Sequence, residues 1–338
     1  MYADNEKKIK ESHPVYLLCG TEGYLIRQYT NQIMEAHMPR EEWDINLHIL
    51  EEMPSYAVLA EAVNSVPFFG GRYGVLVRDA GWLQAGRGSA ADEERIAELM
   101  ANIPEDCRLV LIVQGKADGR KKVTKAVKKY GTVIECDPLK SKEIVPWLQR
   151  RLKELDLRLG GDAMQYFLSV LNLMSEISLD FVEQELKKAA LYTDKKMIDR
   201  KTLTESMAAV PEASVFLLLE ALSDKQTAKV MTLLKQQEES GTPLIRTAML
   251  LARQVRMLWQ ARSVDADGGR VDDVMRECGV RYSFVAEKLL RQSRNFPHRA
   301  LRQAMEDLAD AEQMLKSGRT DGAVLEEIVL KLCMADRR

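Results

Sequence analysis

Short apolar runs alternate with helical patterns over the first 140 residues, and few folds accommodate such an alternation. Three of the apolar runs are almost uninterrupted, as expected for strands that are covered on both faces. This order predicts βαβ units around a parallel sheet of about five strands. The predicted strands are 15–19, 46–50, 74–77, 109–113 and 132–135, and the helices between them are 22–37, 56–66, 92–101 and 121–130.

The β signal ends after Pro138, and helical patterns fill the remainder of the 338 residues. Four helices are predicted before Pro211, at 141–155, 162–174, 179–193 and 202–209, and Thr202-x-x-Glu205 reads as a capping box at the start of the last. We therefore predict three domains, because one core rarely serves so long a chain. They are an α/β domain at 1–140, a small helical domain at 141–210 and an all-α domain at 211–338.

Composition excludes several classes of protein. Hydrophobic residues make up 46% and charged residues 30%, no apolar run approaches the roughly 18 residues that span a bilayer, and the N-terminus lacks a signal-peptide pattern. A chain that grips nucleic acid by itself is usually strongly basic, whereas this net charge is −2. The five cysteines and four histidines are scattered, so we expect no metal site and reduced thiols in a cytoplasm.

An α/β core followed by a small helical domain is the layout of the AAA+ ATPases, but the sequence lacks their phosphate loop. The loop pattern Gly-x-x-x-x-Gly-Lys-Ser/Thr cradles phosphates, and here the segment is LCGTEGYL, residues 18–25. It has no lysine, and Glu22 would repel a phosphate by roughly 1 kcal/mol at about 4 Å even in water. The third strand ends in Arg78-Asp79, where magnesium-binding strands have paired acids. We expect no ATP hydrolysis, no bound cofactor and no catalytic residues.

Two adjacent phenylalanines stand at a helix-to-strand corner, where small or polar residues are usual. Phe68 and Phe69 follow Pro67, which limits the backbone, and precede Gly70-Gly71, which permits a sharp turn. The rings either pack into their own core or wait for a pocket on another protein. Composition leaves both interpretations open.

Several stretches, in order, resemble the bacterial DNA polymerase III delta subunits, the clamp-loader components that open the sliding clamp. They are VYLLCGTEGYLIRQ, VNSVPFFGGRYGVLVRD, VEQELKKAALYTD, the long segment that begins SVFLLLEALSDKQ, and the closing segments SFVAEKLLRQSRNF and LADAEQMLKSGRTDGAVLEEIVLKL. No single stretch is decisive, but six in the right order are hard to obtain by chance.

This resemblance implies a role for each part of the chain. A hydrophobic pair at a helix end inserts into a pocket on the sliding clamp in this family, and Phe68 and Phe69 match that pair, after Pro67. It also implies that ATP is bound by neighbouring subunits, that the 211–338 domain joins the other clamp-loader subunits as a collar, and that primed DNA lies within the complex.

Two basic segments remain ambiguous. Lys121, Lys122 and Lys125 could contact the phosphate backbone of primed DNA, or they form a solvated helix face. The arginines of the 242–262 helix could face neighbouring subunits or water. Two other functions stay open, an active AAA+ ATPase of another DNA-processing assembly and a stand-alone nucleic-acid-binding protein.

Overall fold

The computed structural model describes residues 2–65, 67, 70–174, 176–239, 241, 243–320 and 322–335. The chain divides into two compact units, one formed by Met1–Glu143 with Ser178–Asp180 and the other by Ile144–Ile177 with Phe181–Arg338. The finer division into three domains at 140 and 210 stays a prediction.

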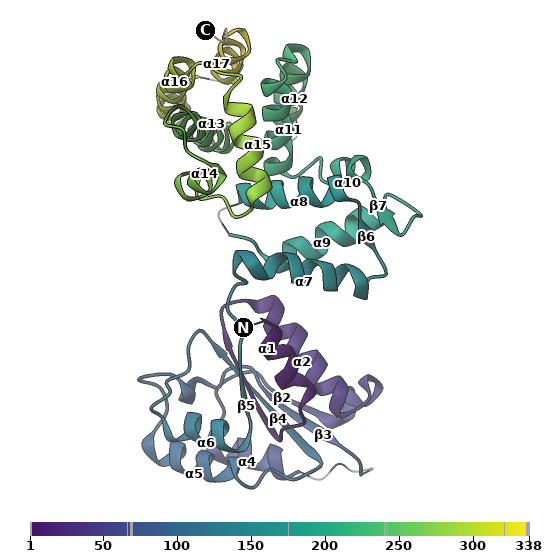
Figure 1. Ribbon diagram of the computed structural model, residues 1–338. Helices are drawn as coiled ribbons and strands as arrows, with labels where there is room; N and C mark the ends of the chain where they lie inside the picture. Colours follow the sequence, from purple (N-terminus) through teal and green to yellow (C-terminus); the bar gives the residue numbers. More distant parts are fainter. Residues whose placement is uncertain are drawn as a thin grey trace. The chain divides into compact units, whose positions relative to one another are not determined.

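The N-terminal unit is built on a five-stranded parallel sheet (Figure 1). Its strands are β1 (Val15–Gly20), β2 (Leu47–Leu50), β3 (Tyr73–Val77), β4 (Cys107–Gln114) and β5 (Thr132–Glu135). They pair in the order β2-β3-β4-β1-β5, and Leu17 in β1 lies opposite Leu111 in β4 and Val133 in β5. The predicted α/β fold class with a parallel sheet is confirmed.

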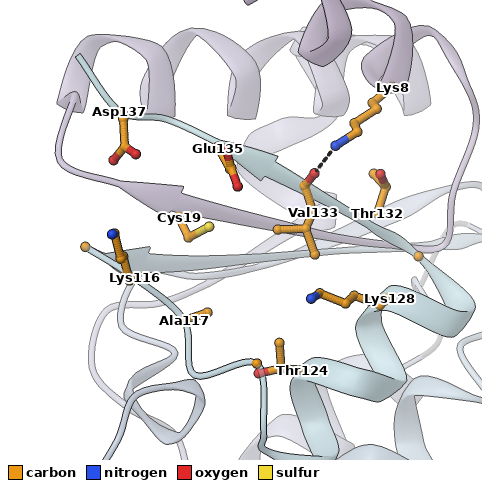
Figure 2. Close-up of a pocket in the computed structure, with 13 residues that line it drawn as sticks. Lys8, Cys19, Lys116, Ala117, Thr124, Lys128, Thr132, Val133, Glu135 and Asp137 are labelled. Atoms are coloured by element: carbon orange, nitrogen blue, oxygen red, sulfur yellow. Dashed lines mark hydrogen bonds between the residues drawn. The ribbon is translucent and has the colours of Figure 1, made fainter. Parts of the chain in front are cut away.

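The outer edge of β5 is covered by α1 (Tyr2–Lys10), a helix that the sequence analysis does not predict. The Asn5 side-chain amide donates to the Glu135 carbonyl at 2.7 Å, and Lys8 Nζ donates to the Val133 carbonyl at 2.8 Å (Figure 2). These bonds satisfy carbonyls of an edge strand that could otherwise pair with another chain. The helix is too polar to show an apolar stripe.

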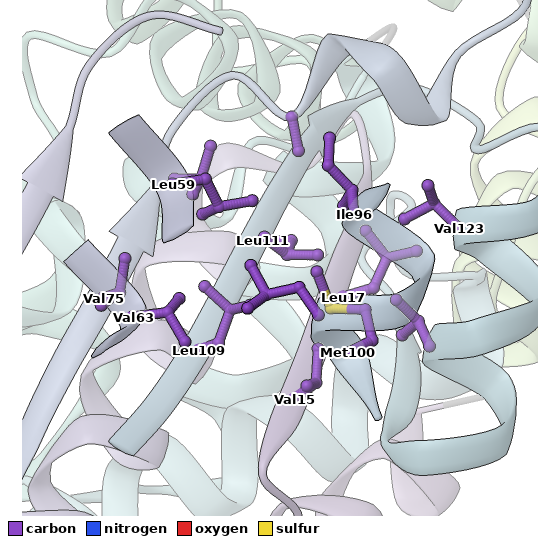
Figure 3. Packing of buried hydrophobic residues seen from close by; sticks show 14 of the residues in the cluster. Val15, Leu17, Leu59, Val63, Val75, Ile96, Met100, Leu109, Leu111 and Val123 are labelled. Atoms are coloured by element: carbon purple, nitrogen blue, oxygen red, sulfur yellow. The ribbon is translucent and has the colours of Figure 1, made fainter. Parts of the chain in front are cut away.

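Helices cover both faces of the sheet (Figure 1). On one side α2 (Gly23–His37) packs against the strands, and on the other lie α4 (Tyr56–Asn64), α5 (Ala90–Met100) and α6 (Lys122–Tyr130). Figure 3 shows the core on this second side, formed by Leu59, Val63, Ile96, Met100 and Val123 of the helices and Val15, Leu17, Val75, Leu109 and Leu111 of the strands. Each such side chain contributes about 1.5–3 kcal/mol by burial.

Helices dominate the second unit and are joined by short connections. They are α7 (Ser141–Glu154), α8 (Gly161–Leu173), α9 (Leu179–Ala190), α10 (Arg200–Ser206), α11 (Pro211–Ser223), α12 (Thr227–Glu239), α13 (Leu244–Ala266), α14 (Val271–Cys278), α15 (Ser283–Ser293), α16 (His298–Lys316) and α17 (Ala323–Met334). The first residues of α7 and α9 belong to the first unit. The first unit adds three short pieces, η1 (Arg40–Glu42), α3 (Trp43–Asn46) and η2 (Gly81–Leu83).

Two local predictions in the helical region are wrong. The helix predicted from Thr202 begins at Arg200, because the Asp199 carboxylate accepts a hydrogen bond from the Thr202 backbone N–H at 2.8 Å and is the N-cap. The β signal also does not end at Pro138, since β6 (Arg158–Leu159) and β7 (Met197–Ile198) form a small parallel pair. Two-residue strands are too short to show an alternation.

The arginines of α13 mostly bind their own chain. Arg253 donates to the carbonyls of Leu173 and Asn172 at the end of α8, where backbone acceptors lack helical partners. Arg246 pairs with Glu212 at 3.0 Å, and Arg262 pairs with Asp265 at 3.1 Å. These contacts within the chain are a third use of the arginines, beside the neighbouring subunits and the water that their sequence positions left open.

His37 fixes the end of α2 to two other segments. Its Nε2 lies 3.1 Å from the Tyr73 carbonyl and 3.0 Å from the Asp106 carbonyl, and its Nδ1 lies 3.3 Å from an Arg108 guanidinium nitrogen. Nε2 therefore carries the proton and donates, while Nδ1 accepts from Arg108. The ring is buried, and this burial is the main reason that the pKa of His37 is lowered.

We expect the stability of the chain to fall with acidity through His37. Because its folded pKa is depressed, the neutral ring stabilises the fold fully above the unfolded pKa of about 6.5, and this contribution is lost as pH falls towards the folded pKa. Urea denaturation at about pH 7.5 and about pH 5.5 should show a smaller acid-induced loss for His37→Gln than for wild type.

His48→Gln is the matched control, because His48 is an exposed histidine in β2 of the same unit. An equal loss of stability in wild type and His37→Gln would contradict the assignment to His37.

Candidate functional site

The chain is firmly attached on both sides of the corner that carries the predicted phenylalanine pair. Before the corner, α4 is held by Leu59 and Val63, both fully buried. After it, the Tyr73 hydroxyl donates to the Val63 carbonyl at 2.6 Å inside the core. The Ser65 hydroxyl also donates to the Ala62 carbonyl at 3.1 Å. The end of α4 and the start of β3 are thus tied to each other.

The corner itself depends on glycine. The Gly70 N–H donates to the Pro67 carbonyl at 2.9 Å, which brings the chain before and after the pair close together. Gly70 and Gly71 have φ values of 69° and 92°, a region that side-chain-bearing residues rarely adopt. An added Cβ at either glycine would meet no atom of the described residues within 4 Å, so among these residues the backbone conformation and not crowding requires glycine.

Phe68 and Phe69 lie outside the described residues, and their predicted contact with a clamp stays a prediction. Pro67 is described and is partly buried. The described residues on both sides of the pair form an anchored corner next to the edge strand β2. The pair stands within this corner in the sequence.

The loop that would hold a nucleotide is filled by the protein's own groups. The Glu22 carboxylate accepts a hydrogen bond from the Tyr24 backbone N–H at 3.1 Å and caps α2, in the position where an anion binds to a helix N-terminus. The Glu22 N–H donates to the Cys136 carbonyl at 2.8 Å. A Cβ on Gly20 would lie 2.2 Å from that carbonyl, so the loop is pressed against the end of β5. Burial raises the pKa of Glu22.

The two charged residues at the end of β3 form ion pairs within the chain. Asp79, which would be a magnesium ligand in an active site of this layout, pairs with Arg87 at 2.7 Å. Arg78, at the position of the expected second acid, pairs with Glu51 at 2.9 Å. The Asp79 carboxylate is therefore already paired, and Arg78 has no carboxylate to offer a metal ion. Within the described ranges, no group of three or more His, Cys, Asp or Glu residues could hold one.

The three lysines whose sequence allows either a DNA contact or a solvated helix face have different surroundings. Lys121 is only 12% exposed, and its Nζ donates to the Trp82 carbonyl at 2.9 Å, the Arg87 carbonyl at 2.6 Å and the Glu93 carboxylate at 2.5 Å. All three ammonium protons are therefore used, which argues against a DNA contact. Lys122 is exposed and pairs with Glu94 at 2.6 Å, and Lys125 is exposed on α6. A DNA contact by these two stays a prediction.

Sequence reasoning missed the internal roles of Glu22 and Lys121. For Glu22 no clear signal existed, because it is the first residue of the predicted 22–37 helix and the usual N-cap residues are Ser, Thr, Asp and Asn. For Lys121 no signal existed, since its partners lie 28 to 39 residues earlier in the chain. In the part of the chain that the structure describes, no helix is long and apolar enough to cross a membrane.

Comparisons with known proteins agree across the chain. The family model described as "DNA polymerase III, delta subunit" matches residues 16–137, and the one described as "DNA polymerase III delta subunit, C-terminal domain" matches residues 212–332. Together the two matches cover more than half of the chain.

Individual relatives show the same similarity. The DNA polymerase III subunit delta of Bacillus subtilis is 27% identical over 98% of this chain and 96% of its own length. A probable DNA polymerase III subunit delta of Aquifex aeolicus is 22% identical over 81% and 78%. The solved structure of the Bacillus subtilis DNA clamp loader delta protein has a TM-score of 0.57 at 24% identity, with 98% and 99% covered, which supports the fold.

The hydrogen bonds of Lys121 to the Trp82 and Arg87 carbonyls and to the Glu93 carboxylate can be tested through stability. Lys121→Met keeps most of the side-chain stem but leaves two carbonyls and a half-buried carboxylate without a donor, so we expect unfolding free energy to fall by about 1–3 kcal/mol. Lys125→Met, at an exposed position of α6, the helix that begins directly after Lys121, should change it by less than about 0.5 kcal/mol. Urea denaturation measures both, and equal effects would show that Lys121 is not structural.

Proposed function

Because this chain belongs to the DNA polymerase III delta subunit family of clamp-loader components, we propose that it binds a sliding clamp through Phe68 and Phe69 and opens it. The observation that carries this proposal is the anchored corner. The Tyr73–Val63 hydrogen bond holds one side, and the Gly70–Pro67 hydrogen bond closes the other. Two large apolar side chains at this corner would contribute the most free energy if a partner protein buried them.

The energy of such a contact is sufficient for a specific interface. Burial of each phenyl ring in a pocket contributes about 1.5–3 kcal/mol, so the pair supplies roughly 3–6 kcal/mol. That is the scale of an interface hot spot. If the corner binds an opened clamp more tightly than a closed one, binding shifts the ring towards its open form in proportion to that difference.

The proposed mechanism is mechanical and needs no nucleotide in this chain. Glu22 occupies the N-terminus of α2, and Arg87 neutralises Asp79, which supports a scaffold without nucleotide chemistry. We propose that ATP is bound by partner subunits and that the helical region from 211 onward joins them. Primed DNA would be a ligand of the assembled loader.

The clamp contact is tested by a double substitution. Phe68→Ala with Phe69→Ala should weaken binding to a purified sliding clamp by at least about 100-fold, because both buried rings are removed. Surface plasmon resonance measures the affinity, and circular dichroism checks the fold. The control pairs Leu191→Ala with Met249→Ala, which removes two exposed apolar side chains elsewhere and should leave binding unchanged.

Undiminished clamp binding by the Phe68 and Phe69 variant would place the contact on another surface. A loss of the same size in the control would indicate nonspecific hydrophobic association instead of a built site.

The absence of nucleotide chemistry has its own test. Titration of the isolated chain with Mg-ATP should give no saturable calorimetric signal, since the Glu22 carboxylate occupies the phosphate position. Tight binding or turnover of ATP by the isolated chain would favour the alternative of an active ATPase.

A further inference from the structure

The two edge strands of the parallel sheet are covered differently. In the order β2-β3-β4-β1-β5, the outer side of β5 is covered by α1, whose Asn5 and Lys8 donate to its carbonyls. At the opposite end of the sheet β2 pairs with β3 alone, and in the described part of the chain no second strand joins it. An edge strand without cover can pair with a strand from another chain.

Every second residue of β2 turns its backbone polar groups away from the sheet. The Leu50 carbonyl accepts a hydrogen bond from the Arg78 N–H at 2.9 Å, so Leu50 faces the β3 side of the strand. Because backbone groups alternate along a strand, Leu47 and Ile49 face outward. The Leu47 N–H donates to the Trp43 carbonyl. The Leu47 carbonyl and both backbone groups of Ile49 have no hydrogen-bond partner among the described residues.

Apolar side chains around β2 are exposed as well. Ile49 is 43% exposed, whereas all five residues of β3 are buried. Ile45, two residues before the strand, is 65% exposed, and Met53 and Val58 after it are also exposed. Edge strands that avoid pairing often carry lysine or proline, and β2 contains neither. The strand therefore presents both backbone groups and an apolar side chain to a partner.

The charge around β2 has one sign. Residues 41–65 contain no lysine or arginine and six acidic residues, which are Glu41, Glu42, Asp44, Glu51, Glu52 and Glu61. Glu51 pairs with Arg78 at 2.9 Å. Glu41, Asp44 and Glu52 are exposed and form no ion pair within the described ranges. These carboxylates attract a cationic partner, and they repel the phosphates of nucleic acid and the same edge of a second copy of the chain.

We propose that the outer edge of β2 binds an extended segment of another protein, in which apolar side chains alternate with lysine or arginine. The segment lies beside β2 as an added strand, which is a recurrent mode of peptide recognition. The Leu47 carbonyl and the Ile49 N–H and carbonyl bond its backbone, and its apolar side chains pack beside Ile49. Its cations meet the carboxylates of Asp44 and Glu52. This binding mode uses neither residue of the phenylalanine pair and is independent of the clamp contact.

Fluorescence anisotropy of the full chain with a labelled peptide tests this surface. The probe is a peptide of about eight residues with blocked ends that alternates valine and lysine, and the reference peptide has glutamate in place of lysine. We expect saturable binding of the lysine peptide, and binding of the glutamate peptide that is weaker by about tenfold or more. Hydrogen exchange of the Ile49 amide should slow when the lysine peptide is added.

Ile49→Pro isolates the backbone contact. Proline removes the outward N–H and keeps the hydrogen bonds to β3, because position 49 donates nothing to β3. We expect it to weaken binding of the lysine peptide by about tenfold or more. The matched control is Ile49→Val, which keeps the donor and a branched apolar side chain and should weaken binding by less than about twofold. Circular dichroism and urea denaturation check that both variants are folded.

The charge contribution is measured with Asp44→Asn combined with Glu52→Gln, both at exposed positions. This variant should weaken binding of the lysine peptide by about threefold or more at low salt. The proposal is overturned by the absence of saturable binding, by equal binding to wild type and Ile49→Pro, or by protection confined to segments other than 47–50. Protection of 47–50 by the sliding clamp, without binding of the lysine peptide, would also overturn it and would assign this surface to the clamp contact.

Discussion

The buried hydrogen bond from the Tyr73 hydroxyl to the Val63 carbonyl joins the last turn of α4 to the first residue of β3. Everything that we propose for the corner depends on this connection, because the described residues of the corner, 65, 67 and 70–72, belong to no helix or strand. Val63 and Tyr73 are both buried in the core of the parallel sheet. The packed sheet therefore fixes the positions of the two ends of the corner.

The loops beside the same sheet are held by contacts within the chain. These contacts lie at the positions where a nucleotide-binding protein of this layout would hold phosphate and magnesium. Glu22 caps the helix that would receive phosphate, and Arg87 pairs with the acid at the end of β3. The fold is preserved because the apolar strands and their covering helices specify it, and these do not depend on the loops.

The strands were predictable from sequence because both faces of the sheet are covered, which makes strands such as β3 continuously apolar. Features that rely on long-range polar contacts were not. α1 is polar and is held by side-chain bonds from Asn5 and Lys8 to the carbonyls of β5, a partnership that no local pattern reveals. From the sequence Lys121 resembles any exposed lysine of a basic helix, but its ammonium group donates to two carbonyls of a segment distant in the chain. The phenylalanine pair stands out between Pro67 and two glycines, whose effect on the backbone is local, but its role in clamp binding came from the family resemblance and stays a prediction.

Backbone hydrogen exchange with and without a sliding clamp is the most direct measurement of whether the corner is the clamp-binding element. We expect amides of residues 65–72 to become protected when the clamp is added, while the amides of the β4 and α2 core keep the same exchange rates. Protection confined to other segments, with residues 65–72 exchanging as they do in the free chain, would contradict the account.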